Sequence, residues 1–167
     1  MEYNIRAVCM RDCEGINRLR RMPGVFENIL GRPSERVMDT EAFIQNLGKD
    51  DHEFVAVIPD ETGRETVIAC GGLHIFPNPR LRHSAGIGLM VHADYQNRGI
   101  GTKMMETILD VADNWLMLKR LELGVFTDNV RAIKLYEKMG FVQEGIKRNA
   151  AIRNGEYIDE MMMARLK

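Results

Sequence analysis

One stretch of the 167-residue sequence has residue types and spacing suited to holding an anion. Residues 96–102 read Gln-Asn-Arg-Gly-Ile-Gly-Thr and stand directly before a segment with helical periodicity. Glycine lets the backbone adopt positive φ and approach a ligand closely, and the first N–H groups of a helix have no partner within it. The sequence therefore predicts an anion site where a strand passes into a helix.

Two familiar phosphate motifs are absent from this stretch. Lys103 is not preceded by glycine, so a Walker A loop is excluded. A dinucleotide fingerprint that starts at Gly86 or Gly99 needs a further glycine where Val91 or Met104 stands. These mismatches argue against a nucleotide-binding regulator.

The elements around the glycines predict how the site is positioned. Apolar residues recur at 104, 108, 111 and 115, and in parallel at 105, 109, 112 and 116, which predicts an amphipathic helix over 100–117. Strand patterns precede it at 85–91 and follow it at 121–125. A strand–helix–strand unit of this length predicts a parallel pair with a right-handed crossover.

The rest of the chain predicts hairpins and short helices. Strands are expected at residues 3–7, 54–58 and 66–70, and two more within 141–166 around the Asn-Gly turn at 153–155. Helices are expected after Asp12, after Thr40 and, closed by Gly140, after Asn129. Residues 24–36, with Gly24, Gly31 and Pro33, predict a loop or a broken helix. We therefore expect one α/β domain over 1–167, a mixed and mostly antiparallel sheet with one parallel pair and helices on both faces.

Composition narrows the class of protein. Lys and Arg number 23 against 24 Asp and Glu, and this balance disfavours a nucleic-acid partner. Three cysteines without a CxxC pair and four histidines without HExxH predict a reduced, metal-free, cytoplasmic protein. No apolar run is long enough to predict a membrane span, and the first residues lack the apolar segment of a signal peptide.

Two blocks of the sequence resemble motifs of the GCN5-related N-acetyltransferase (GNAT) family. Gln96-x-x-Gly99-x-Gly101 is similar to motif A, and residues 125–141, Val-Phe-Thr-Asp-Asn-x-x-Ala-x-x-Leu-Tyr-x-x-Met-Gly-Phe, are similar to the motif B region. The tail at 153–157 looks like the branch that contains bacterial L-amino-acid N-acetyltransferases and phosphinothricin acetyltransferase relatives. The element order is also the family's.

The resemblance implies acetyl-CoA as co-substrate, with its pyrophosphate on the motif A turn and its pantetheine paired with the preceding strand. Gly86 and Gly88 fit a strand that bulges or admits another backbone. Asn129 is a helix cap, a cofactor contact, or both. The implied cofactor-binding residues are Leu89, Met90, Val91, Gln96, Asn97, Arg98, Gly99, Ile100, Gly101, Thr102, Asn129 and Tyr136.

The implied reaction is direct transfer of the acetyl group to an amine. Tyr136 matches the tyrosine that protonates the leaving thiolate, and a backbone N–H near Met90 would stabilise the oxyanion. Cys70 lies in an apolar strand and is expected to be inert. Many members carry a glutamate on the strand before motif A, but residues 84–91 contain no carboxylate. The base stays open between Glu122, His74 and a water chain to the backbone.

The acceptor is expected to be the α-amine of an L-amino acid or an analogue. The resemblance implies an acceptor site of Phe26, Glu27, Arg32, His74, Phe76 and Tyr157, with Arg80, Arg82 and Arg153 as possible carboxylate partners. The alternatives are a protein N-terminus, a lysine or an aminoglycoside as acceptor, or a CoA sensor without catalysis. A homodimer paired through the last strands is a further open expectation.

Overall fold

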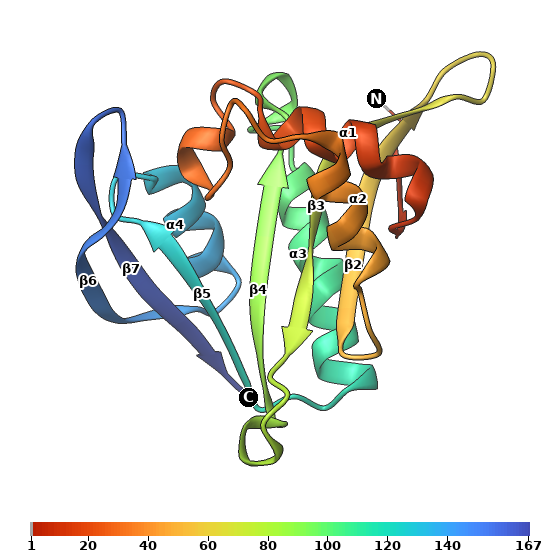
Figure 1. Cartoon of the computed structure of the whole chain (residues 1–167). Coiled ribbons are helices and arrows are strands. Elements are labelled where there is room, and N and C mark those ends of the chain that lie inside the picture. Colours follow the sequence, from red (N-terminus) through yellow and green to blue (C-terminus); the bar gives the residue numbers. More distant parts are fainter. Residues whose placement is uncertain (1) are drawn as a thin grey trace.

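The computed structural model describes residues 2–167 and folds them around a seven-stranded sheet (Figure 1). The spatial strand order is β1-β2-β3-β4-β5-β7-β6. The strands are β1 (Asn4–Ala7), β2 (Asp51–Pro59), β3 (Glu65–Ile75), β4 (Ser84–Val91), β5 (Arg120–Phe126), β6 (Val142–Arg153) and β7 (Glu156–Leu166). The expected mixed and mostly antiparallel sheet is confirmed, because only the β4–β5 pairing among these strands is parallel.

Helices cover both faces of the sheet, as predicted (Figure 1). The four are α1 (Cys13–Arg20), α2 (Val37–Gln45), α3 (Ile100–Asp110) and α4 (Val130–Lys138). On one face, Ile16 and Leu19 of α1 pack with Val55 and Cys70 of the sheet. Helices α3 and α4 pack on the opposite face, where the largest buried cluster lies.

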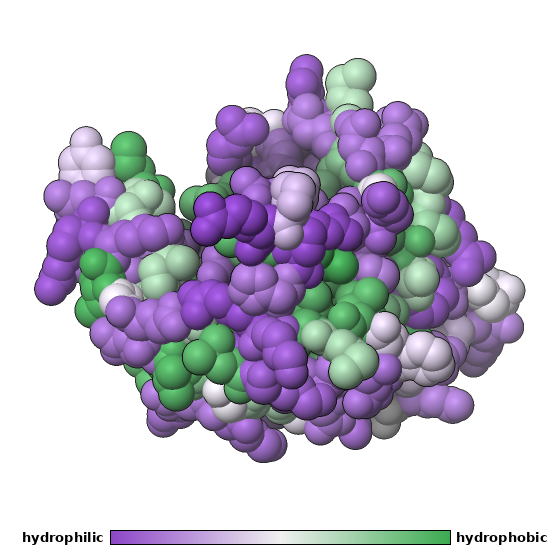
Figure 2. Space-filling view, turned by 90° about the horizontal axis from the view of Figure 1, so that it is seen from below, coloured by the Kyte–Doolittle hydropathy of each residue, from purple (hydrophilic) through white to green (hydrophobic). Residues whose placement is uncertain are grey.

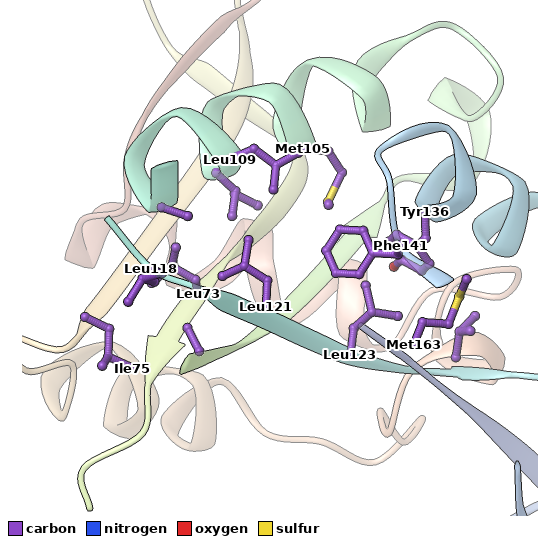
Figure 3. Packing of buried hydrophobic residues seen from close by; sticks show 14 residues of the cluster. Leu73, Ile75, Met105, Leu109, Leu118, Leu121, Leu123, Tyr136, Phe141 and Met163 are labelled. Carbon is purple, nitrogen blue, oxygen red and sulfur yellow. The ribbon is translucent and has the colours of Figure 1, made fainter. Parts of the chain in front are cut away.

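The largest cluster joins the two helices of the second face to the centre of the sheet. Met105 of α3 and Tyr136 of α4 lie beside Leu121 and Leu123 of β5, together with Phe141 (Figure 3). The ring centroids of Tyr136 and Phe141 are 6.0 Å apart. This packing holds α3 and α4 on the same face of the sheet, next to β4 and β5, the two strands that form the site.

The parallel pair β4–β5 is short, and this shapes the molecule. Its register contains only Ser84↔Arg120, Ala85↔Leu121 and Gly86↔Glu122. Beyond these pairs the two strands diverge (Figure 1). The edge of β4 from residue 87 to residue 91 therefore faces an opening and not a neighbouring strand.

Three local expectations are wrong. Asp12 does not cap α1; its carboxylate accepts hydrogen bonds from Arg6 at 2.8 and 2.7 Å and from the Cys9 N–H at 2.8 Å. Helix α2 begins at Val37, before Thr40, because the Asp39 carboxylate accepts from the Arg36 N–H at 3.1 Å.

The third wrong expectation concerns the end of the long helix. Residues Val111–Trp115 form a π-helical turn in place of further α-helix. A π turn holds more residues than an α turn and rotates the following side chains around the axis. Trp115, predicted on the apolar face, is consequently 77% exposed.

The end of the molecule that carries the C-terminus is mostly polar. Figure 2 shows hydrophilic residues over most of the end that carries the C-terminus, with smaller hydrophobic patches. Within residues 2–167 no helix is long and apolar enough to cross a membrane. The same residues hold no cluster of ligands suited to a metal ion, and their three cysteines are free.

Candidate functional site

The opening between β4 and β5 is a cavity of about 490 Å³. Its walls come from the open edge of β4, the diverging part of β5, the turn before α3, and α4. Part of the loop that follows α1 closes its mouth, including Gly24, Val25 and Ile29. Ten of the twelve predicted cofactor-binding residues line it: Leu89, Met90, Val91, Gln96, Asn97, Gly99, Gly101, Thr102, Asn129 and Tyr136.

The turn before α3 presents a run of free amides. The N–H groups of residues 97–102 donate to no acceptor within residues 2–167, while the Lys103 N–H bonds the Gly99 carbonyl at 3.0 Å. Asn97 and Gly99 have φ of 60° and 81°. Left-handed residues between right-handed ones turn successive N–H groups inward as an anion-binding nest. The helix dipole adds positive potential at the same place.

Three predicted residues of this turn are placed differently from the rest. The Gln96 side chain points at backbone: its Nε2 donates to the Val91 carbonyl at 3.0 Å and to the Gly24 carbonyl at 3.3 Å. The guanidinium of Arg98 lies 5.5 Å from the ring centre of Tyr95 and outside the cavity wall. Ile100 is 1% exposed and packs in the core. The predicted cofactor residues Arg98 and Ile100 therefore do not line the cavity.

The edge of β4 offers backbone groups at alternate residues. The β3–β4 register is unbroken, so Gly86 and Gly88 produce no bulge. The His92 N–H and the Ser84 carbonyl both bond toward β3. In an antiparallel ladder this alternation turns the N–H and C=O of residues 87, 89 and 91 to the open edge. The N–H of Met90, expected near the oxyanion, points to β3 instead, and Leu89 and Val91 present theirs.

Helix α4 supplies a tyrosine and a basic surface to the cavity. Tyr136 lines the cavity wall, and its hydroxyl has no hydrogen-bond partner within residues 2–167. Burial raises the pKa of Tyr136 to about 12, so it stays a proton donor at neutral pH. Asn129 is a helix cap, accepting from the Ala132 N–H at 3.3 Å, and also lines the cavity. The basic lining residues Arg131 and Lys134 were not predicted.

A second cavity, of about 400 Å³, lies beneath α1 and α2 and meets the first at β4. Gly88, Leu89 and Met90 line both cavities. The other walls of the second are apolar residues and a charged group of four: Arg20, Glu35, Asp39 and Glu53. None of these four residues was predicted from the sequence.

Arg20 and Glu53 are the notable members of the charged group. Arg20 is ion-paired to Glu35 through Nε, and its two terminal nitrogens donate no hydrogen bond within residues 2–167. Glu53 is on β2 and half-buried, and burial, with the nearby Asp51 charge, raises its pKa to about 7. Glu53 lies on the same face of β2 as the buried Val55 and Val57, which alternate with it along the strand. This alternation could have marked Glu53 as inward-facing, but the strand was predicted to begin only at residue 54.

Most of the predicted acceptor residues lie away from these cavities. Phe26, Glu27, Arg32, Phe76 and Tyr157 line neither of the two, nor the third described next. The Glu27 carboxylate instead accepts from the Gly24 N–H at 2.8 Å, and Tyr157 is 68% exposed. Two of the predicted carboxylate partners are also engaged: Arg82 pairs with Asp50 at 2.6 Å, and Arg153 pairs with Asp128.

A third cavity, also of about 400 Å³, opens where β4 and β5 separate and contains both predicted bases. His74 is half-exposed, and its Nδ1 lies 2.6 Å from Asp51. Glu122 is ion-paired with Arg120 at 2.9 Å. Each predicted base therefore already has a charged partner.

The splayed parallel pair, the open strand edge and the nest of amides together form a site for an extended ligand that carries an anionic group at one end. The chain belongs to the acetyltransferase (GNAT) family, whose model matches residues 20–141. This confirms the family resemblance found in the sequence, and with it N-acetyltransferase activity and acetyl-CoA as co-substrate.

Individual relatives narrow the comparison. The chain is 36% identical to the L-amino acid N-acetyltransferase AaaT of Escherichia coli (strain K12) over 99% of each chain. It is 27% identical to spermidine N(1)-acetyltransferase of the same organism over 64% of this chain and 60% of the relative. Among solved structures, yncA from Salmonella typhimurium with its cofactor acetyl-CoA superposes with a TM-score of 0.80 at 18% identity, covering 99% and 94% of the chains.

Proposed function

We propose that the protein transfers the acetyl group of acetyl-CoA to the α-amine of an L-amino acid or a close analogue. One observation carries the proposal: a second cavity meets the cofactor cavity at Gly88, Leu89 and Met90 and contains a guanidinium with free terminal nitrogens. The L-amino acid N-acetyltransferase that is 36% identical over the whole chain supports the same acceptor class.

We assign the first cavity to acetyl-CoA. The free amides of residues 97–102 suit the pyrophosphate, and hydrogen bonds to a charged group contribute about 1.5–3 kcal/mol each. The open edge at residues 87, 89 and 91 suits the amide groups of pantetheine, which would add to the sheet like a strand. Arg131 and Lys134 on α4 supply further positive charge for phosphate.

Within this assignment, Tyr136 is the proton donor to the departing thiolate. Its hydroxyl has no partner within residues 2–167, so it is free to donate. The amides of Leu89 and Val91 replace that of Met90 as the backbone groups that face the oxyanion. No enzyme nucleophile is needed, and burial raises the pKa of the Cys70 thiol, which keeps it protonated.

We assign the second cavity to the acceptor. The terminal nitrogens of Arg20 fit a carboxylate in the bidentate geometry that arginine favours. Ile16, Ile29 and Phe43 form an apolar wall for a side chain. An amino acid held in this way would direct its amine toward Gly88, where the two cavities meet.

A polyamine is the second candidate acceptor, and a charge imbalance favours it. Glu35, Asp39 and Glu53 outnumber Arg20 in the second cavity. A cation without a carboxylate would be attracted by this surplus, and a spermidine acetyltransferase is among the relatives.

Release of CoA thiol from acetyl-CoA, measured with each of the twenty L-amino acids, spermidine, a peptide and an aminoglycoside, tests the proposal. We expect turnover with one or a few amino acids, and we expect Arg20→Lys to raise their KM at least tenfold. Turnover confined to spermidine, the peptide or the aminoglycoside would refute the amino-acid assignment. The Lys119→Arg variant, at an exposed residue that lines none of the three cavities, serves as the matched control.

We also propose a cytoplasmic location, which the three free cysteines support. A small-molecule amine is then the expected partner. The homodimer anticipated from the sequence stays a prediction, and gel filtration with light scattering tests it.

A further inference from the structure

Three glycines form a row across the sheet on the face covered by α1 and α2. Glu53 of β2 is opposite Gly72 of β3, and Gly72 is opposite Gly88 of β4. Gly124 of β5 lies two residues beyond the last β4–β5 pair, as Gly88 does on β4. Residues directly opposite one another project from the same face of a sheet. The row is therefore a trough without side chains that runs toward the opening between β4 and β5.

Two carboxylates lie over this trough from its two ends. A Cβ at Gly72 would lie 2.7 Å from Glu53 Cδ, so the Glu53 side chain covers Gly72. A Cβ at Gly124 would lie 2.2 Å from Glu160 Oε1, so Glu160 covers Gly124. Between them, a Cβ at Gly88 would meet no atom within 4 Å. The space above Gly88 is open and has Glu53 on one side and Glu160 on the other.

The two carboxylates differ in their partners. Glu160 is ion-paired with Lys147 at 3.2 Å. Glu53 has no ion-pair partner within residues 2–167, and the one hydrogen bond that it accepts there comes from the Cys70 thiol, at 4.0 Å. Like Glu160, the other charged side chains that share a cavity with Glu53 each have an ion-pair partner. The pairs are Arg20 with Glu35, Asp39 with Arg36, His74 with Asp51, and Glu122 with Arg120. Glu53 is the group that a positively charged ligand would satisfy.

We propose that Glu53 accepts the proton of the acceptor ammonium, and that the acceptor nitrogen meets the thioester in the open space above Gly88. The proposal rests on the acetyl transfer described above but not on which amine is the acceptor. Glu53 lines the second and third cavities, and Gly88 lines these and the cofactor cavity. The raised pKa of Glu53 suits a group that must take and release protons near neutral pH.

The proton balance assigns one role to each group. The ammonium gives one proton to the Glu53 carboxylate, and the neutral nitrogen then uses its lone pair to form the C–N bond. The carbonyl π pair moves to oxygen and returns as the C–S bond breaks, leaving the electron pair on sulfur. The Tyr136 hydroxyl gives its proton to that sulfur and regains one from the nitrogen of the new amide. Glu53 releases its proton to water, so that one proton is set free per turnover.

The test is the pH dependence of kcat/KM in wild type and in Glu53→Gln, with any amine that turns over. Wild type is expected to lose activity below about pH 7 as Glu53 becomes protonated. Glu53→Gln is expected to lose 10²–10⁴-fold at pH 8. Its limb near pH 7 should be replaced by a dependence on the ionisation of the amine itself, because only amine that is already neutral can then react. Acetyl-CoA affinity, measured by calorimetry, should stay within about twofold, because Glu53 lies outside the cofactor cavity.

Two further variants keep the test decisive. Glu144→Gln removes a carboxylate that is paired with Arg120 outside all three cavities, and it should leave the profile unchanged. Glu53→Asp keeps the acid on a shorter chain and should recover part of the rate and the acidic limb. An unchanged profile in Glu53→Gln, an equal loss of acetyl-CoA affinity, or transfer of the effect to Glu122→Gln would overturn the proposal.

The outcome also separates this proposal from the proposed function. Turnover with spermidine but with no amino acid would refute the amino-acid assignment and still allow the Glu53 test. Turnover with amino acids and an unaffected Glu53→Gln would refute only the role of Glu53. No turnover with any amine would overturn both.

Discussion

Replacing Glu53 by Gln should make the folded protein more stable at alkaline pH. Burial raises the pKa of this carboxyl from its ordinary value of 4.5 to about 7. Between these values the folded chain holds a proton that the unfolded chain has lost, so the free energy of unfolding decreases as the pH rises from 4.5 through 7. Glutamine has nearly the same shape and no charge, and it removes this cost.

The size of the effect follows from the two pKa values. At about 1.4 kcal/mol for each pH unit, the difference between 4.5 and about 7 amounts to about 3 kcal/mol at pH 8. At pH 5 the gain falls to about 1 kcal/mol, because most of the range lies above that pH. For a chain of this length, 3 kcal/mol corresponds to a rise in Tm of about 6–12 °C.

Urea unfolding of both proteins at pH 5 and pH 8, followed by circular dichroism, measures the effect. Glu144→Gln is a control of opposite sign, because the hydrogen bonds from Arg120 hold the pKa of Glu144 below its ordinary value. Removing that carboxylate should cost stability at pH 8. A Glu53→Gln variant that is no more stable at pH 8, or equally stabilised at pH 5, would refute the argument that Glu53 is buried at a cost.

Other substitutions test the cofactor turn, the proton donor and the trough. Tyr136→Phe should lower kcat by 10²–10⁴-fold and leave both Tm and acetyl-CoA affinity unchanged, since the hydroxyl has no partner to lose within residues 2–167. Gly99→Ala, at φ 81°, should destabilise the turn by about 1–2 kcal/mol and weaken acetyl-CoA binding about tenfold in calorimetry. Gly88→Val should fold normally, because a Cβ there meets no atom within 4 Å, but should lower kcat/KM for the amine at least tenfold in the thiol-release assay while acetyl-CoA still binds. Normal amine kinetics in Gly88→Val would place the reaction elsewhere.

The parts of the fold that depend on local pattern were predictable from the sequence. The alternation at residues 3–7 and 121–125, the Asn129 cap and the Asn-Gly turn all predicted elements that the structure contains. The start of α2 and the capping of α1 were not predictable from local sequence, because the carboxylates of Asp12 and Asp39 could each accept hydrogen bonds from several groups. The partner of Asp12 is Arg6 on β1, a contact that forms only when the chain folds.

The cofactor side of the site was predicted more fully than the acceptor side. The conformation of the turn at residues 96–102 is determined by local sequence, because Gly99 directly precedes the first residue of helix α3. The second cavity combines Arg20 from α1, Glu53 from β2 and Met90 from β4, which only the folded sheet brings together. Glu53 was missed because its strand begins at Asp51 but was predicted to begin at residue 54, although its phase with Val55 marked Glu53 as inward-facing.

The short pairing between β4 and β5 also affects how the folded chain opens locally. Three residue pairs join the block β1–β4 to the block β5–β7 within the sheet, whereas β3 and β4 share seven. Amide hydrogen exchange should therefore divide the sheet at this seam, with the two blocks opening as separate cooperative units. A molecule of acetyl-CoA lying along β4 and reaching α4 would contact both blocks and stabilise their association. At a concentration of 100 times its Kd it would add about 2.7 kcal/mol of stability and should slow exchange on both sides of the seam together.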